Sequence, residues 1–486
     1  MPTIYEALMQ AVSCQQAGQL EAAASIYQQI LAVDPNNIDA WHLLGVVACQ
    51  VGKAEDAVKC IERALQLCPD HPDAHNSLGL ALKELGRLDE AAASCRRAVE
   101  LNSTALVHYN LGSILQSQGK LQEAVECFRR AISLQPNDAE SHNNLGLALR
   151  DLGQLEEAAA CFQQALALNP ASVEAHMNQS SLLLLHGDFD RGLQEYEWRW
   201  QAGLSPRRDP GKPLWDGGSV QGKTVLVYAE QGYGDTLQFI RYAPLVKSLG
   251  ATVLVEEQPR MISLLSTCPG IDRIVPSGSE LPPFDCYSPL LSLPRILRTS
   301  LETIPAQVPY LFADKVRVSR WREALSGNPG FRIGINWHGR EGKGDFLKRD
   351  IPLELFASLA EIPGISLISL QRGGGPQLAS KGHHLPIFDP GDDVDTAGGA
   401  FIDTAAIMMN LDLVITSDTA VPHLAGAIGV PVWTALPFLP DWRWLLDRSD
   451  SPWYPTMRLF RQKQSGDWTT VFDEIRAALT KQIAFS

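Results

Sequence analysis

The sequence lacks any long hydrophobic run. No window among its 486 residues approaches the roughly 20 uninterrupted apolar residues that a membrane-spanning helix requires. The first residues, MPTIYEALMQ, also lack the basic start and apolar stretch of a secretory signal. We therefore expect a cytoplasmic chain without a transmembrane segment.

Positive charge is scarce as well. The chain has 41 Lys and Arg against 55 Asp and Glu, which gives a net charge of −14. Binding to nucleic acid depends on clustered Lys and Arg against the phosphates, so this balance argues against nucleic acid as the main partner. The sequence still allows a local basic pocket that binds a single diphosphate.

The nine cysteines form no C-x-x-C pair, and their number is odd. Three of them, Cys60, Cys127 and Cys161, fall at one position of the repeat described below, where a small buried residue fits. We interpret the cysteines as reduced packing residues, in keeping with a cytoplasmic location.

Length and composition indicate several ordinary globular domains. A chain of 486 residues is too long for one core, and 45% hydrophobic with 20% charged residues is typical of a soluble protein.

The first two hundred residues contain an internal repeat. Small residues, aromatic or apolar residues and prolines recur at fixed distances around glycines that are 33 or 34 residues apart: Gly18, Gly52, Gly86, Gly119, Gly153 and Gly187. This predicts helix–turn–helix units in which the glycine forms the turn, an alanine such as Ala57 allows close helix packing, and a proline such as Pro69 ends the second helix.

The segment AWHLLGVVACQVGKAEDAVKCIERALQLCPD resembles a tetratricopeptide repeat. Five clear repeats run from about residue 4 to 172, and VEAHMNQSSLLLLHGDFDRGLQEYEWRW is a degenerate sixth, so we assign residues 1–200 to the array. The resemblance implies a right-handed α superhelix whose concave groove binds extended peptides, and therefore a protein partner or acceptor.

Asn110, Asn144 and Asn178 share one position of the repeat. A ladder of asparagines can bond a peptide backbone without reading its side chains, as in the similar repeats of eukaryotic O-GlcNAc transferases. The alternative is that a polar residue of the first helix simply faces water. Both interpretations stay open.

The period ends after Trp200, and QAGLSPRRDPGKPLWDGG predicts a linker over residues 201–219. Beyond it, apolar runs such as TVLVYAE, TVLVEE, FRIGINW and LDLVITS alternate with helical patterns. This alternation predicts parallel sheets flanked by helices. We expect two Rossmann-like lobes, at 220–322 and 323–486, with a cleft between them.

The stretch DGGSVQGKT contains a complete G-x-x-x-x-G-K-T match with Gly217, Gly222, Lys223 and Thr224. A phosphate-binding loop of this type follows a strand and precedes a helix. Here a linker precedes the match and a strand follows it. We interpret it as a turn that leads into the first strand.

A better candidate follows that strand, in AEQGYGDTLQFIRY. Gly232, Gly234 and Asp235 lie between strand and helix, at the carboxyl edge where open α/β sheets bind ligands. Asp235 can also act as a helix cap.

Together with LDLVITSDTAVPHLAGAIGVPVW, this G-x-G-D pattern resembles family 9 glycosyltransferases, whose best-known members are heptosyltransferases. The second motif, D-T-[GA]-x-x-H-x-A-[GA]-A, is matched by Asp418, Thr419, Ala420 and His423 with the alanines that follow, although the usual DTG is DTA here. The resemblance covers residues 220 to 480. It implies a GT-B fold, a nucleotide-sugar donor and inverting transfer without a metal or other cofactor, with Asp235 as general base. It also implies that residues 220–322 form the acceptor side and 323–486 the nucleotide-sugar side, and that the amphipathic segment WTTVFDEIRAALTKQI is a helix that crosses back to pack on the first lobe.

The expected nucleotide-sugar site comprises Gly232, Gly234, Lys348, Arg349, Gln371, Ser417, Asp418, Thr419, Ala420 and His423. A helix N-terminus after the Ser-Asp-Thr turn offers N–H donors to the departing diphosphate. Lys348 and Arg349 can face it from the other side, and Gln371 ends a strand where related enzymes contact the base. The alternatives are a core histidine in a capped helix and a solvated basic loop.

Asp393 and Asp395 match the D-x-D pattern that elsewhere binds a metal and a sugar diphosphate. We interpret it as an acidic loop, with Asp403 and Thr404 capping the next helix.

These observations favour a glycosyltransferase that modifies a protein hydroxyl, with the repeats recruiting the acceptor. One alternative transfers sugar to a glycan or lipid-linked acceptor, as heptosyltransferases do. The other is a repeat scaffold whose transferase domain is inactive. The identities of base, sugar and acceptor are not predicted.

Overall fold

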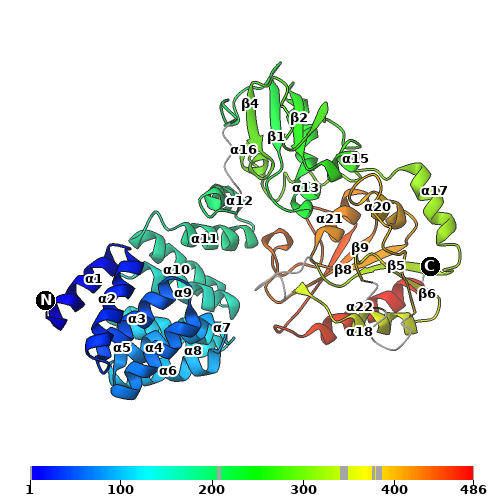
Figure 1. The fold of residues 1–486 in the computed structure, drawn as a ribbon. Helices are drawn as coiled ribbons and strands as arrows, with labels where there is room; N and C mark the ends of the chain where they lie inside the picture. The colour runs from blue at the N-terminus through cyan, green and yellow to red at the C-terminus, as the bar shows by residue number, and fades with distance from the viewer. Residues whose placement is uncertain (1–2, 205–209, 340–348, 375–377, 379–385, 485–486) are drawn as a thin grey trace. The chain divides into compact units, whose positions relative to one another are not determined.

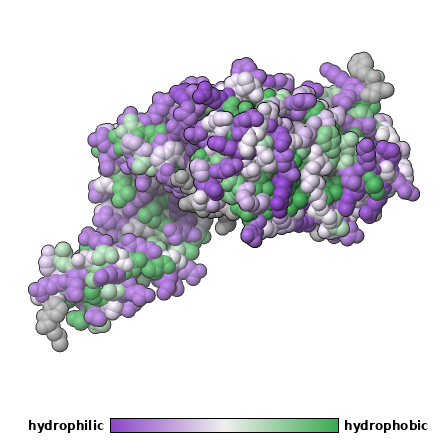
Figure 2. Space-filling view, turned by 90° about the horizontal axis from the view of Figure 1, so that it is seen from above, coloured by the Kyte–Doolittle hydropathy of each residue, from purple (hydrophilic) through white to green (hydrophobic). Residues whose placement is uncertain are grey.

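The computed structural model describes residues 3–204, 210–339, 349–374, 378 and 386–484. Contacts divide the chain into two compact units, Met1–Gln179 and Ser180–Ser486. No helix in the described ranges is both long enough and apolar enough to cross a bilayer. On the face seen in Figure 2, hydrophilic and hydrophobic residues are intermixed.

The first unit is a stack of helix pairs (Figure 1). Its helices are α1 (Ile4–Gln16), α2 (Leu20–Val33), α3 (Ile38–Gln50), α4 (Ala54–Leu67), α5 (Pro72–Glu84), α6 (Leu88–Leu101), α7 (Ala105–Ser117), α8 (Leu121–Leu134), α9 (Ala139–Asp151) and α10 (Leu155–Leu168), followed by α11 (Val173–Leu185).

The predicted turns and helix ends are confirmed. Glycines such as Gly18 and Gly52, both at φ +74°, form the turns in the left-handed region that only glycine adopts without strain. Pro69 follows the end of α4 at Leu67. First helices are capped by side chains such as Asn37 and Asp138, which accept from N–H groups of the first turn.

The cysteine prediction is only partly right. All nine cysteines are free thiols. However, Cys60, Cys127 and Cys161, in the middle of the second helices, are only half-buried. Cys95 is the fully buried thiol of the repeats, and burial raises its pKa to about 12.

The second unit begins at Ser180, within α11, and continues with α12 (Phe189–Glu195) and the 3₁₀ helix η1 (Tyr196–Trp200). A parallel sheet follows in the order β3-β2-β1-β4. Its strands are β1 (Thr224–Tyr228), β2 (Thr252–Glu257), β3 (Arg273–Pro276) and β4 (Cys286–Pro289). Its helical segments are α13 (Tyr233–Phe239), η2 (Ile240–Tyr242), α14 (Ala243–Ser248), η3 (Pro259–Met261), α15 (Ile262–Leu265), η4 (Leu290–Ser292) and α16 (Leu293–Ile296).

A second parallel sheet has the order β10-β9-β8-β5-β6-β7. Its strands are β5 (Phe331–Asn336), β6 (Ile365–Ser369), β7 (Ile387–Phe388), β8 (Leu413–Ser417), β9 (Val432–Leu436) and β10 (Met457–Arg461). Its helical segments are α17 (Lys315–Ala324), α18 (Leu353–Ala357), η6 (Ser358–Glu361), α20 (Ile402–Met408), α21 (Ala420–Ala427), η7 (Trp442–Trp444) and α22 (Trp468–Ala484). The predicted parallel α/β architecture of the C-terminal part is thus confirmed, and Figure 1 shows both sheets flanked by helices.

The returning C-terminal helix is a correction. The GT-B resemblance implies that this helix crosses to the first lobe, but α22 packs on the second sheet. Its Phe472 contacts Phe356 at 4.8 Å between ring centroids, and Ile475 and Leu479 join the core around Ile333. The apolar face of α22 is therefore buried on the sheet that it follows in the chain, beside β10 and α18.

Two boundaries differ from the pattern of the sequence. Residues 180–200, which the period assigns to the sixth repeat, belong to the second unit. Helix α17 crosses the boundary drawn between residues 322 and 323, and it packs against α20 of the second sheet.

The stretch DGGSVQGKT is a turn before a strand. Gly217 (φ +98°) and Gly222 (φ +72°) have left-handed backbones, and Thr224 begins β1. The N–H of Lys223 donates to the carbonyl of Val220 at 3.0 Å. The order turn–strand excludes phosphate cradling of the strand–loop–helix kind.

Candidate functional site

The structure brings the two glycosyltransferase-like motifs into contact, although they lie nearly two hundred residues apart in the sequence. Helix α13 carries Gly234 and Asp235, and it packs against α21, which follows the Ser-Asp-Thr turn. A Cβ added to Gly234 would lie 3.4 Å from both the Cα of Ala420 and the Cδ2 of His423. This is van der Waals distance, so the two helices lie close together at Gly234.

Asp235 is both a helix cap and a member of this site. One carboxylate oxygen accepts from the N–H of Gly232 at 3.0 Å, and the other is 2.5 Å from Nη2 of Arg443. Burial raises the pKa of Asp235, while the positive charge of Arg443 opposes the rise. The side chain stays 21% exposed, so a small molecule can reach it.

Arg443, which the sequence analysis missed, is the central cation of the cluster. It comes from η7, after β9, and also bonds Asp441 (Nη1–Oδ1 2.9 Å) and Gln238 (Nε–Oε1 2.6 Å). Burial acts to raise the pKa of Asp441, but Arg443 and Arg349 hold it below the usual value. The signal was the D-W-R-W run after a strand at the carboxyl edge of the sheet.

In the Ser-Asp-Thr turn at the end of β8, one predicted residue is buried in the strand and another caps the following helix. Ser417 is fully buried within β8, and its hydroxyl has no partner among the described residues. Thr419 caps α21: its hydroxyl accepts from the N–H of Val421 at 3.2 Å and donates to Asn336 at 3.0 Å. Its side chain therefore fixes the turn.

Asp418 faces the same polar region with an unsatisfied oxygen. Only 5% of Asp418 is exposed, and Oδ2 accepts no hydrogen bond within the described part of the chain. Nη1 of Arg349 lies 3.8 Å from that oxygen. Burial raises the pKa of Asp418, and Arg349 opposes the rise. A buried oxygen without a hydrogen bond is costly, so this place suits a ligand hydroxyl.

His423 is a neutral, packed histidine. Its ring stacks on Trp444 at 5.1 Å, and Nδ1 is 3.0 Å from the hydroxyl of Tyr454. Burial, followed by the charge of Arg443, lowers the pKa of His423 to about 3. The imidazole therefore carries no positive charge near neutral pH, which leaves hydrogen bonding as its means of contacting a phosphate or ribose.

The neighbouring strand ends complete the region. Oε1 of Gln371, after β6, accepts from Nδ2 of Asn336 (2.8 Å) and from the N–H of His338 (3.1 Å). Asn336, at the end of β5, in turn accepts from Thr419. Gln371 thus tightens the loop after β5, and Asn336, which the sequence analysis missed, joins three adjacent strand ends.

Of the two predicted basic residues, Arg349 lies at the site, while Lys348 lies outside the described residues. The described ranges hold no group of three or more His, Cys, Asp or Glu side chains arranged for a metal ion.

The helix cap beyond the D-x-D loop is a correction. Asp403 and Thr404 lie inside α20, and the carboxylate of Asp395 accepts from their N–H groups at 2.7 and 3.2 Å. Asp395 therefore caps the helix in place of the two predicted residues.

In the first unit, the predicted asparagines bond the first helices of successive repeats. Nδ2 of Asn110 donates to Asn76 at 2.9 Å, and Nδ2 of Asn178 donates to Asn143 at 2.9 Å. Asn144 donates to the hydroxyl of Tyr109 at 2.9 Å. Asn110 is buried, whereas Asn144 and Asn178 are half-buried.

Comparisons with known proteins decide the nature of this first unit. Models of the tetratricopeptide repeat match residues 26–59, 43–105, 103–171 and 143–211. The N-terminal part consists of tetratricopeptide repeats. The last of these matches includes residues 180–200, which make their contacts in the second unit.

Solved structures are similar to this chain over about a third of its length. MamA is 27% identical, with a TM-score of 0.31, over 33% of this chain and 94% of its own. A thermophilic tetratricopeptide repeat protein of Thermus thermophilus is 21% identical, with a TM-score of 0.33, over 37% of this chain and 100% of its own. These scores are low, and the repeat assignment rests on the family models.

One curated relative extends beyond the repeats. Protein FlbA of Caulobacter vibrioides is 27% identical over an alignment of 325 residues, and the match covers 62% of this chain and 54% of FlbA. The chain therefore spans about half the length of this relative.

Proposed function

We propose that the second unit is a GT-B-type glycosyltransferase, which moves a sugar from a nucleotide-sugar to a hydroxyl of a protein that the tetratricopeptide repeats recruit. One observation carries the proposal. Gly234 packs against Ala420 and His423, so the G-x-G-D loop and the Ser-Asp-Thr turn form one polar region. It combines an accessible carboxylate, a helix N-terminus, a partly exposed guanidinium and an unsatisfied buried oxygen.

Each group has a role in a direct displacement. Asp235 takes the proton of the acceptor hydroxyl while the hydroxyl oxygen bonds to the anomeric carbon, and the bond to the nucleoside diphosphate breaks with inversion. The N–H groups at the start of α21 and the guanidinium of Arg349 stabilise the charge that develops on the diphosphate. Asp418 accepts a hydrogen bond from a hydroxyl of the sugar or ribose.

The pairing of Asp235 with Arg443 does not prevent this role. A carboxylate offers about four acceptor positions, and Gly232 and Arg443 occupy two of them. The same contacts support the alternative of an inactive scaffold, because an ion-paired carboxylate is a weaker base. The repeats support a protein acceptor over a glycan or lipid-linked one, since such arrays bind polypeptides.

Donor hydrolysis by the full chain tests the proposal. We expect turnover with at least one sugar from a panel of UDP-, GDP- and ADP-sugars, and a loss of about 10²–10⁴-fold in Asp235→Asn, which keeps the size of the side chain. Asp393→Asn, in the exposed loop before α20, is the matched control and should leave turnover unchanged.

The pH profile supplies a second criterion. A general base acts only when deprotonated, and burial raises the pKa of Asp235. Activity should therefore be lost as the pH falls through that raised value, above the ordinary aspartate pKa of about 3.9.

The absence of turnover with every donor would favour the scaffold. A difference in protein glycosylation between cells with and without the chain, seen by mass spectrometry, would separate a protein acceptor from a glycan or lipid.

A further inference from the structure

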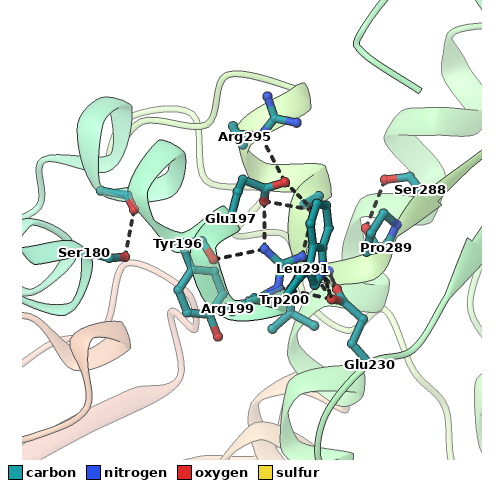
Figure 3. A network of polar contacts seen from close by, with 12 residues as sticks. Ser180, Tyr196, Glu197, Arg199, Trp200, Glu230, Ser288, Pro289, Leu291 and Arg295 are labelled. Carbon is teal, nitrogen blue, oxygen red and sulfur yellow. Dashed lines mark hydrogen bonds and ion pairs between the residues drawn. The ribbon is translucent and has the colours of Figure 1, made fainter. Parts of the chain in front are cut away.

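The segment Y-E-W-R-W, residues 196–200, contacts the loop that carries the candidate base. Arg199 lies in η1 and has no exposed surface. Its Nε lies 3.1 Å from Oε1 of Glu230, and its Nη2 lies 3.0 Å from Oε2. Figure 3 shows these two side chains pointing toward each other. This two-pronged geometry fixes both the distance and the orientation of a carboxylate.

The remaining contacts leave neither charge unsatisfied. Arg199 also bonds Glu197 (Nη1–Oε1 2.8 Å) and Ser292 (Nη2–Oγ 2.8 Å). The carboxylate of Glu230 further accepts from Nε1 of Trp200 at 3.0 Å and from the N–H of Leu291 at 3.2 Å. A buried ion pair is stable only when its other polar atoms are bonded in this way. Glu230 is therefore held at a defined place (Figure 3).

Glu230 directly precedes the glycine loop. It comes two residues after the end of β1 and five residues before Asp235. The next residue, Gln231, accepts from the hydroxyl of Tyr196 at 3.4 Å. The ring of Tyr196 also lies 6.3 Å from that of Trp442, the neighbour of Arg443. The 3₁₀ helix η1 thus contacts both the start of the loop and the segment that pairs with Asp235.

We propose that Arg199 is a positioning residue of the transferase: its fork to Glu230 sets the backbone that presents Asp235. The claim that Arg199 affects catalysis rests on the proposed function. The claim that Arg199 orders residues 230–236 does not.

The test uses three variants of the full chain. Arg199→Lys keeps the charge but loses the fork. Arg199→Met combined with Glu230→Gln removes both buried charges, and Glu197, which Arg199 also bonds, keeps its ion pair with Arg295 at 3.6 Å, so that the protein can fold. Arg317→Lys is the matched control, because Arg317 also bonds a buried carboxylate of the same unit, Asp403 at 2.8 Å, away from the loop.

Hydrogen exchange and donor kinetics are then measured. We expect amide exchange in residues 230–236 to accelerate about tenfold or more in both Arg199 variants, with residues 420–427 unchanged. We expect kcat to fall by about 10²-fold with little change in the donor KM, because misplacing a reacting group affects the transition state. Arg317→Lys should change neither quantity.

Three results would overturn the inference. The first is unchanged exchange in residues 230–236, and the second is accelerated exchange there with an unchanged kcat. The third is uniform acceleration across residues 180–486, because that is the signature of general destabilisation. If the wild-type chain turns over none of the UDP-, GDP- and ADP-sugars, the proposed function fails. Hydrogen exchange alone then decides whether Arg199 orders the loop.

Discussion

Single charged side chains determine what the polar region can bind. The three sides of the Arg443 guanidinium face groups of the chain itself: Asp235, Asp441 and Gln238. Arg349 is more exposed, because 28% of its side chain is accessible. In the proposed function, Arg349 is therefore the cation that faces the diphosphate, while Arg443 keeps the carboxylates in place.

The variant Arg349→Ala should weaken donor binding. A hydrogen bond to a charged group contributes about 1.5–3 kcal/mol, so Kd should rise roughly 10- to 100-fold. Isothermal titration with the nucleotide-sugar that supports turnover measures this change. Lys223→Ala, in the turn before β1, is the control and should leave Kd unchanged; weaker binding by this variant instead would revive the phosphate-loop interpretation of DGGSVQGKT.

At the scale of single residues, the sequence predicted which residues lie at the site better than it predicted their charge and burial. Asp235, Asp418 and Arg349 were predicted and lie together, because motifs at strand ends meet at one sheet edge. The sequence left a core histidine open at His423, but its partners Trp444 and Tyr454, whose packing makes it neutral, come from a segment after β9 that no motif marks. Arg443 was missed for the same reason.

At the scale of elements, polar contacts link the helices of the repeats. The first helices carry asparagines that bond across neighbouring repeats, such as Asn110 to Asn76 between α7 and α5. Both side chains are buried, so each amide depends on the other for a hydrogen-bond partner. The ladder thus has a structural role, and its half-buried members Asn144 and Asn178 keep the predicted peptide-binding role open.

Asn110→Ala should therefore destabilise the repeats. It leaves the amide of Asn76 buried without its partner, which costs about 1–3 kcal/mol. Urea unfolding followed by the helical circular dichroism signal measures the loss. Asn102→Ala, at an exposed position after α6, should change the free energy of unfolding by less than about 0.5 kcal/mol. Equal effects of the two variants would contradict the role of the buried pair.

Elements with strong local signals were predictable, and those defined by distant contacts were not. Glycine turns and proline ends mark the repeat helices, and apolar runs mark β1, β5 and β8. The packing of α22 on its own sheet depends on Phe356 and Ile333, far away in the sequence. Likewise, the repeat period does not predict the contacts of residues 196–200 with Glu230.

At the scale of the whole molecule, the chain joins tetratricopeptide repeats to an α/β unit with two parallel sheets. Under the proposed function, the first unit recruits a protein and the second transfers a sugar to it. The central claim concerns the second unit, because recruitment has a chemical purpose only if the polar region binds a nucleotide-sugar.

A crystal structure with a bound nucleotide-sugar tests that claim most directly. We predict the diphosphate at the N-terminus of α21, beside Thr419 and Arg349, with the anomeric carbon facing the carboxylate of Asp235. A donor bound elsewhere in the chain would contradict the account, and so would an anomeric carbon turned away from Asp235, which would leave that residue as a helix cap alone.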